Sequence, residues 1–172
     1  MTKKMAPRTL MALIAALGVA WNVFAQSPQL NAVDKAFVDA AASNGLAEIQ
    51  LAKLAAGRAS HAAVREFAAR LEADHTQANL EVRKIADSQG IDVAQEMGPY
   101  QAAAKRLTEL DGAAFDRAHL QHVIQEHEEA IAQFTREAQE GQNPQLKAFA
   151  SKMLPKLREH QQTAQQLADG QS

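Results

Sequence analysis

The residues best suited to chemistry in this sequence are one glutamate and three histidines, each on a different helical segment: Glu48, His75, His127 and His160. An α-helix turns by about 100° per residue, and this period places each of the four within about 50° of the centre of an apolar face. Imidazole nitrogen and carboxylate oxygen are ligands of Zn, Fe, Mn and Cu, and a thiolate site is excluded because the chain has no Cys. The pattern therefore predicts a single divalent metal ion in the core of a helical bundle.

The level of these four side chains along the bundle axis is the second part of the prediction. Counted from the turns, an up-down-up-down bundle brings all four within about 10 Å along its axis. If the link between the second and third long helices instead crosses the length of the bundle, His160 is expected to move away by about one turn.

Two interpretations without a metal remain open for the same four residues. In the first, the protein is an interaction or stress-related structural protein, in which His and Glu pair with one another in a buried polar layer. Such pairing stabilises the fold, because each buried polar group left unpaired costs roughly 1–3 kcal/mol of folding free energy. In the second, the bundle responds to pH, because three buried histidines can titrate between about pH 5 and 8.

Four acidic residues are expected to support the site or to act as alternative ligands: Glu72, Asp74, Asp116 and Glu126. Asp74 lies at the edge of its helix face, where its carboxylate can orient a histidine of a neighbouring helix, as the outer partner of a metal ligand does. Glu126 points largely outward. Asp116 lies inward near a helix start, where a first-turn carboxylate is favoured by the helix dipole.

A second histidine pattern occurs on the third long segment, His119-x-x-His122-x-x-x-Glu126. These three residues share one helix face and have spacing suited to a surface metal site. Because the helical period turns this face away from the apolar stripe, we expect it to be solvated and not to form a site.

Apolar residues recur at helical spacing in four long segments and one short segment, at about 33–58, 61–89, 112–139 and 144–168, with the short one at 99–110. Ser60 and Asn143 are suited to be N-caps, and Pro144 to the first position of its helix. Strands are not expected, because no alternating run of β-branched residues appears. We therefore expect an all-α fold, a four-helix bundle with a short extra helix between helices two and three, with 33–168 as one domain and 169–172 as a tail.

The second and fourth long segments resemble each other. The stretches 67–75 and 149–160 both begin at Phe, and both end in an acidic residue followed by His. This similarity suggests that the bundle consists of two related helical hairpins.

The first 25 residues have the three parts of an export signal, which are a basic start, an apolar stretch at about 10–21 and the small-x-small pattern Val23-Phe24-Ala25. Residues 26–32 follow as a leader. We expect a protein exported to the periplasm, or secreted, with no membrane span after signal removal. Lipid attachment is not expected, because no Cys follows the signal.

The charge of the chain argues against a nucleic-acid partner. Removal of 1–25 takes away three basic residues and no acidic one, so the formal net charge falls from −2 to −5. No basic run remains, and the chain has one Trp and one Tyr, so a phosphate-binding surface and stacking platforms are both missing. Alanine-rich faces such as 102–104 suit self-association, so a homo-oligomer is possible, and any protein partner is unknown.

Several stretches of this chain resemble the bacterial exported family called domain of unknown function 4142, whose members are often labelled putative outer-membrane proteins. The resemblance rests on Glu-Ile-Gln-Leu-Ala-Lys-Leu-Ala at 48–55, on 67–79 with Asp-His-Thr-Gln-Ala-Asn, on Gly-Ala-Ala-Phe-Asp-Arg-Ala at 112–118 and on His160. It covers about 33–168. The resemblance implies a ferritin-like four-helix bundle and export, and it implies no established activity.

Ferritin-like di-iron proteins use a Glu from each of two helices and a Glu-x-x-His pair from each of the other two. Glu72 and His75 match this pair formally, but Leu157 stands three residues before His160 and breaks the second pair. A single metal ion, or none, therefore agrees better with the sequence than a di-iron centre. Because no nucleophile, oxyanion or phosphate-binding motif accompanies the histidines, we do not expect an enzyme.

Overall fold

The computed structural model describes residues 30–93 and 100–170. Five helices follow in chain order: α1 (Ala32–Arg58), α2 (Ala62–Ser88), α3 (Tyr100–Thr108), α4 (Gly112–Glu140) and α5 (Pro144–Asp169). No strand occurs among the described residues, so the predicted all-α class is confirmed. The predicted export signal at 1–25 and most of the predicted leader at 26–32 lie outside these residues.

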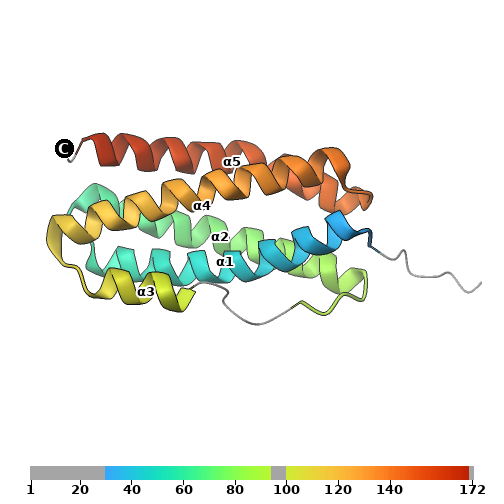
Figure 1. Ribbon diagram of the computed structural model, residues 1–172, viewed down its shortest axis with the longest axis horizontal. Coiled ribbons are helices and arrows are strands. Elements are labelled where there is room, and N and C mark those ends of the chain that lie inside the picture. The colour runs from blue at the N-terminus through green and yellow to red at the C-terminus, as the bar shows by residue number, and fades with distance from the viewer. Residues whose placement is uncertain (1–29, 94–99, 171–172) are drawn as a thin grey trace, which may run out of the picture.

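The four long helices lie side by side, and the short α3 lies along one side of them at one end (Figure 1). α1 packs mainly on α2, α4 packs mainly on α5, and α3 contacts both α1 and α4. α2 and α4 run in the same direction in Figure 1, so the link between them crosses the length of the bundle. The tight turns at 59–61 and 141–143 only allow their helices to reverse, whereas the segment at 89–111 is long enough to cross.

Side-chain caps start most of the long helices. The Asn31 side chain accepts a hydrogen bond from the first turn of α1, and Asn143 accepts two from the first turn of α5, where Pro144 occupies the first position as predicted. The expected cap of α2, Ser60, is displaced by one residue: His61 is the N-cap, and its Nδ1 accepts from a backbone N–H at 3.3 Å. Ser60 instead bonds to another helix.

Asp116 of α4 holds the turn between α1 and α2. Its Oδ1 accepts a hydrogen bond from the backbone N–H of Ser60 at 2.8 Å, and its Oδ2 accepts from the Ser60 hydroxyl at 2.7 Å and from the His61 N–H at 2.8 Å. Burial acts to raise the pKa of Asp116, but these hydrogen bonds hold it below its ordinary value. Asp116 is therefore a structural carboxylate at one end of the bundle.

Asp34 of α1 makes the equivalent contact with the turn between α4 and α5 at the opposite end. Its carboxylate accepts hydrogen bonds from the backbone N–H groups of Gln142, at 2.9 Å, and Asn143, at 3.2 Å. Each hairpin thus binds the turn of the other hairpin through one buried aspartate, and the two carboxylates tie the hairpins together at both ends.

These contacts repeat at a constant spacing in the sequence. Asp34 and Asp116 are 82 residues apart, and so are Arg65 and Lys147. Arg65 and Lys147 each donate a hydrogen bond at 2.9 Å to a backbone carbonyl of the turn before their own helix. The repetition agrees with the suggestion of two related hairpins and fixes how their residues correspond.

The apolar core consists of two clusters. One contains residues of α1, α2, α3, α4 and α5, with Phe67 and Phe115 as its largest side chains. The other surrounds Phe37, Phe134 and Phe149, whose rings pack with centroids 4.8 to 6.2 Å apart. The histidines of the candidate site lie between these two clusters. One further buried polar group, a carboxyl, lies at the end of α4.

That carboxyl belongs to Glu137, which has no exposed surface and no hydrogen-bond donor to either oxygen among the described residues. It lies against the Asp34 carboxylate. Burial, together with the neighbouring Asp34 carboxylate, raises the pKa of Glu137 to about 7. Glu137 is therefore protonated below neutral pH, and above it the Asp34 carboxylate repels its charge.

Replacing Glu137 with glutamine is expected to raise the free energy of unfolding at pH 8 by about 1–3 kcal/mol and to leave it nearly unchanged at pH 4. The folded-state pKa is raised, so the stabilisation by the protonated acid is complete below its ordinary value and is lost as the pH rises through about 7. Urea unfolding at both pH values measures the difference. The exposed Glu128→Gln on the same helix serves as the control, and an equal gain at both pH values would contradict this account.

Candidate metal centre

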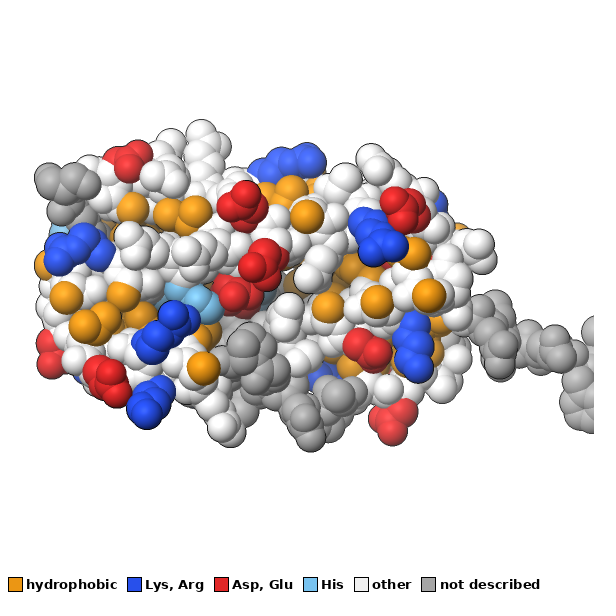
Figure 2. All heavy atoms as spheres, in the orientation of Figure 1, with side chains coloured by type: hydrophobic (Ala, Val, Ile, Leu, Met, Phe, Trp, Pro, Cys, Tyr) orange, Lys and Arg blue, Asp and Glu red, His pale blue; other side chains and the backbone are white. Residues whose placement is uncertain are grey.

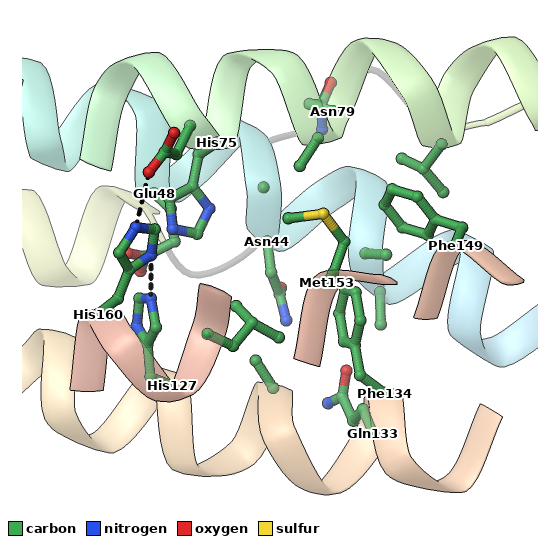
Figure 3. A pocket seen from close by; sticks show the side chains of 18 residues that line it. Asn44, Glu48, His75, Asn79, His127, Gln133, Phe134, Phe149, Met153 and His160 are labelled. Carbon is green, nitrogen blue, oxygen red and sulfur yellow. Dashed lines mark hydrogen bonds and ion pairs between the residues drawn. The ribbon is translucent and has the colours of Figure 1, made fainter. Parts of the chain in front are cut away.

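Three histidines from three helices converge in the middle of the bundle (Figure 3). They are His75 of α2, His127 of α4 and His160 of α5, and one ring nitrogen of each lies within 4.8 Å of the others. His127 and His160 are buried. With a link that crosses the bundle, His160 is expected to lie about one turn away from the other histidines. It lies beside them instead, so this expectation is wrong.

The hydrogen bond of His127 fixes which of its nitrogens is free. Its Nδ1 lies 2.9 Å from the carbonyl oxygen of Val123, one turn earlier on α4. A carbonyl oxygen can only accept, so Nδ1 carries the proton of the neutral ring and Nε2 has a lone pair. This lone pair points toward His160.

His160 is oriented in the same way by a carboxylate. Its Nε2 lies 2.9 Å from Oδ2 of Asp74, so Nε2 donates and Nδ1 has the lone pair. Nε2 of His127 and Nδ1 of His160 are 3.4 Å apart, joined by a dashed line in Figure 3. Two lone pairs at this distance repel each other unless a cation lies between them.

His75 supplies the third nitrogen. Its Nε2 is buried and has no hydrogen-bond partner among the described residues. The ring stacks on His160 with the centroids 5.7 Å apart and meets His127 edge-on at 5.4 Å. An orphaned imidazole nitrogen in this position is available as a ligand.

A proton is a poor occupant of this site at neutral pH. Burial lowers the pKa of His75 and of His160, and burial with the neighbouring His75 lowers the pKa of His127 to about 3. The imidazoles are therefore neutral, which is the form that binds a metal ion.

Asp74 takes the orienting position that the sequence predicts for it. Replacing Asp74 with alanine is expected to lower Zn²⁺ affinity by about 10–100-fold, because His160 loses the partner that sets its tautomer and ring angle. Calorimetric titration of Zn²⁺ measures the change. The exposed Asp87→Ala on the same helix removes a carboxylate away from the site and should leave the affinity unaltered; a similar loss in both variants would argue against an orienting role.

Glu48 of α1 lies in the wall of the same cavity, but it is not one of the three groups that come within 4.8 Å of one another. Its Oε1 lies 3.4 Å from Nε2 of His122. Burial acts to raise the pKa of Glu48, but the bond with His122 and the nearby His75 and His127 lower it to about 2. Glu48 is therefore a buried anion beside the histidines.

The expectation that His119 and His122 face solvent is wrong. His119 is buried, with neither ring nitrogen partnered among the described residues, and the His122 side chain is mostly buried against Glu48. The reason is α3, which covers this face of α4: Ala103 and Leu107 of α3 belong to the core. A helical wheel drawn for one segment cannot show that a second helix packs over the face it predicts to be exposed.

The remaining candidates lie outside the histidine group. Glu72 and Glu126 are only partly buried, and Asp116 binds the turn at one end of the bundle. The Glu48–His122 pair is a contact beside the histidines that the sequence analysis did not predict. The spacing of His119, His122 and Glu126 on one face was its only signal.

A cavity of about 60 Å³ adjoins the three imidazoles and is lined by all four long helices. Figure 3 shows Met153 and the Phe149 ring on the side of the cavity away from His160, with Asn44 between the two groups. On the outer face drawn in Figure 2, acidic and basic side chains are interspersed, without an extended basic patch.

The fold and the site describe an all-α bundle with a histidine cluster in its core. The chain belongs to the family described as "Domain of unknown function (DUF4142)", whose sequence profile matches residues 22–167. No match was found among curated proteins or among solved structures. None of the described helices has the length and apolar content needed to cross a membrane.

Proposed function

We propose that this protein is a periplasmic, ferritin-like helical bundle that binds one divalent metal ion through His75, His127 and His160. The observation that carries the proposal is the pair of facing lone pairs on His127 and His160, because both outer nitrogens are committed as donors. A cation between these two nitrogens would bind both lone pairs and remove their repulsion.

The spacing of two of the three nitrogens fits a small, tetrahedral ion, and the ligand atom of His75 lies within 4.8 Å of both. Metal–nitrogen bonds of about 2.0–2.1 Å at tetrahedral angles separate two ligand nitrogens by about 3.3–3.4 Å. The nitrogens of His127 and His160 are 3.4 Å apart. Three imidazoles favour Zn²⁺ or Cu²⁺ over Mn²⁺, since affinity follows the order of the divalent series.

Metal titration of the purified protein, after chelator treatment, tests this function. We expect one Zn²⁺ per chain and a rise in the unfolding temperature on binding, since an ion that binds only the folded state stabilises it. Elemental analysis of protein from the periplasm then identifies the resident ion. No binding below about 100 μM of Zn²⁺, Cu²⁺, Fe²⁺ or Mn²⁺ would reject the proposal.

Export and the ferritin-like relation rest on separate observations. The basic, apolar and small-x-small parts of 1–25 support export, and the single long crossing link between α2 and α4 is the connection that ferritin-like bundles use. N-terminal sequencing of the periplasmic protein is expected to begin at Gln26, and a chain that retains Met1 would contradict export by this signal.

A further inference from the structure

Three histidines leave one position of a tetrahedral ion without a protein ligand. The fourth long helix, α1, supplies no histidine to this group, and the carboxylate that it brings into the cavity wall is Glu48. The Glu48 carboxylate is paired with His122 on the far side. Structural metal sites have four protein ligands, whereas a site with three keeps a position for an exogenous one.

The cavity beside the histidines offers space for such a ligand. Gly45 and Ala78, in its wall, are 82 residues before His127 and His160, so they are the equivalents of two ligands in the other hairpin. Neither position carries an imidazole. The Asn79 amide fills the space next to Gly45, where a Cβ would lie 2.8 Å from its Nδ2, whereas the small Ala78 side chain leaves part of the cavity open.

The size of the cavity limits its occupant. One water molecule needs about 10–15 Å³ of such volume, so a cavity of about 60 Å³ holds a molecule of a few heavy atoms. Most of its walls are apolar, formed by residues such as Ala41, Ala78, Met153 and Phe149. A small molecule that is soluble in apolar surroundings fits these walls.

The charge of the walls decides between neutral and anionic molecules. Glu48 and Asp74 both line the cavity. Asp74 is partly exposed and is also paired with Lys156 at 3.5 Å, so the buried carboxylate beside the histidines is Glu48. An anionic ligand next to Glu48 would meet the repulsion of this carboxylate, and that repulsion is strong in a low dielectric.

We infer that the fourth position of the bound metal ion takes a small uncharged molecule of two or three heavy atoms, admitted through this cavity. The inference rests on the proposed function, since the ligand binds to the ion that the three histidines hold. Glu48 excludes anions from the position and does not itself bind the ion.

Nitric oxide and azide, added separately to the Co²⁺-loaded protein without oxygen, test the inference. The visible absorption of Co²⁺ reports a change of ligands. Nitric oxide is expected to change the spectrum at micromolar concentration, and azide is expected to have no effect at one hundred times that concentration. Tight azide binding, or no response to nitric oxide, would overturn the inference.

Two variants test the role of the cavity volume and the role of the Glu48 charge separately. Ala78→Leu fills the cavity and is expected to weaken nitric oxide binding at least tenfold while Co²⁺ affinity stays within twofold, with the exposed Ala73→Leu on the same helix as control. Glu48→Gln is expected to strengthen azide binding at least tenfold. If Glu48→Gln instead lowers Co²⁺ affinity as much as His75→Ala does, Glu48 is a ligand and the inference fails.

The same experiments distinguish this inference from the proposed function. Failure of Co²⁺ and the other divalent ions to bind removes both. Normal metal binding by the wild-type protein, combined with absent nitric oxide binding, removes only the inference about the fourth position.

Discussion

Replacing His75 with alanine is expected to lower Zn²⁺ affinity by more than about 100-fold, a larger loss than removal of an outer partner causes. Nε2 of His75 has no hydrogen-bond partner among the described residues, so replacing this ring breaks no hydrogen bond at that nitrogen. The helix content is expected to stay unchanged. Calorimetric titration gives the affinity, and circular dichroism gives the helix content.

A second readout of the same variant is the metal-dependent stability. Ions at 100 times their dissociation constant stabilise a folded protein by about 2.7 kcal/mol. His75→Ala should abolish this gain at the same Zn²⁺ concentration. His61→Asn is the matched control, because it removes an exposed imidazole and retains an acceptor at the N-cap of α2. Equal loss of Zn²⁺ affinity in both variants would contradict the assignment.

The histidine group could be predicted from the sequence because it depends on two local quantities. The helical period places each imidazole on an apolar face, and the distance from a turn sets its level. The prediction counts His75 from the turn at 59–61 and His127 back from the turn at 141–143. His127 also lies about as far from the start of α4 as His75 lies from the turn at 59–61, and Asp116 binds these two places together. Their levels therefore match in the crossing topology, although an up-down-up-down bundle was the basis of the expectation.

The contacts that the sequence did not predict depend on the partner of each helix face. Glu48 lies on an apolar stripe as expected, but its nearest base is His122. The period of α4 turns His122 away from the long-helix core, and only the short α3 makes that side an interior. Such a cover follows from where the link between α2 and α4 passes, and local periodicity has no information about it.

The contact of Asp116 and Asp34 with the turn of the other hairpin could not be predicted either, because it joins side chains to backbone groups far away in the sequence. A carboxylate near a helix start is commonly explained by its own helix dipole. Asp116 instead accepts from Ser60 and His61, which belong to the turn of the other hairpin. The repeat offset of 82 becomes informative only after Asp34 is seen to make the same contact.

Replacing Asp116 with alanine is therefore expected to lower the free energy of unfolding by about 3–5 kcal/mol, the second large effect after loss of the metal. The change leaves two backbone N–H groups and one hydroxyl of the turn without their acceptor, and a hydrogen bond to a charged group contributes about 1.5–3 kcal/mol. Urea unfolding at pH 7 measures the loss. Asp116→Asn should lose less, because one amide oxygen still accepts.

The pH dependence of this loss separates the carboxylate from simple packing. The folded-state pKa of Asp116 is lowered, so its stabilisation is present above the ordinary value of 3.8 and disappears as the pH falls through the folded-state pKa. The difference between Asp116→Ala and wild type should therefore be constant from pH 5 to 8 and should shrink at acid pH. Asp111→Ala, which removes an exposed ion pair with Arg58, should cost less than about 1 kcal/mol. Because α4 and the α1–α2 turn meet at Asp116, a small effect there would mean that apolar contacts, and not this carboxylate, hold the hairpins together at this end.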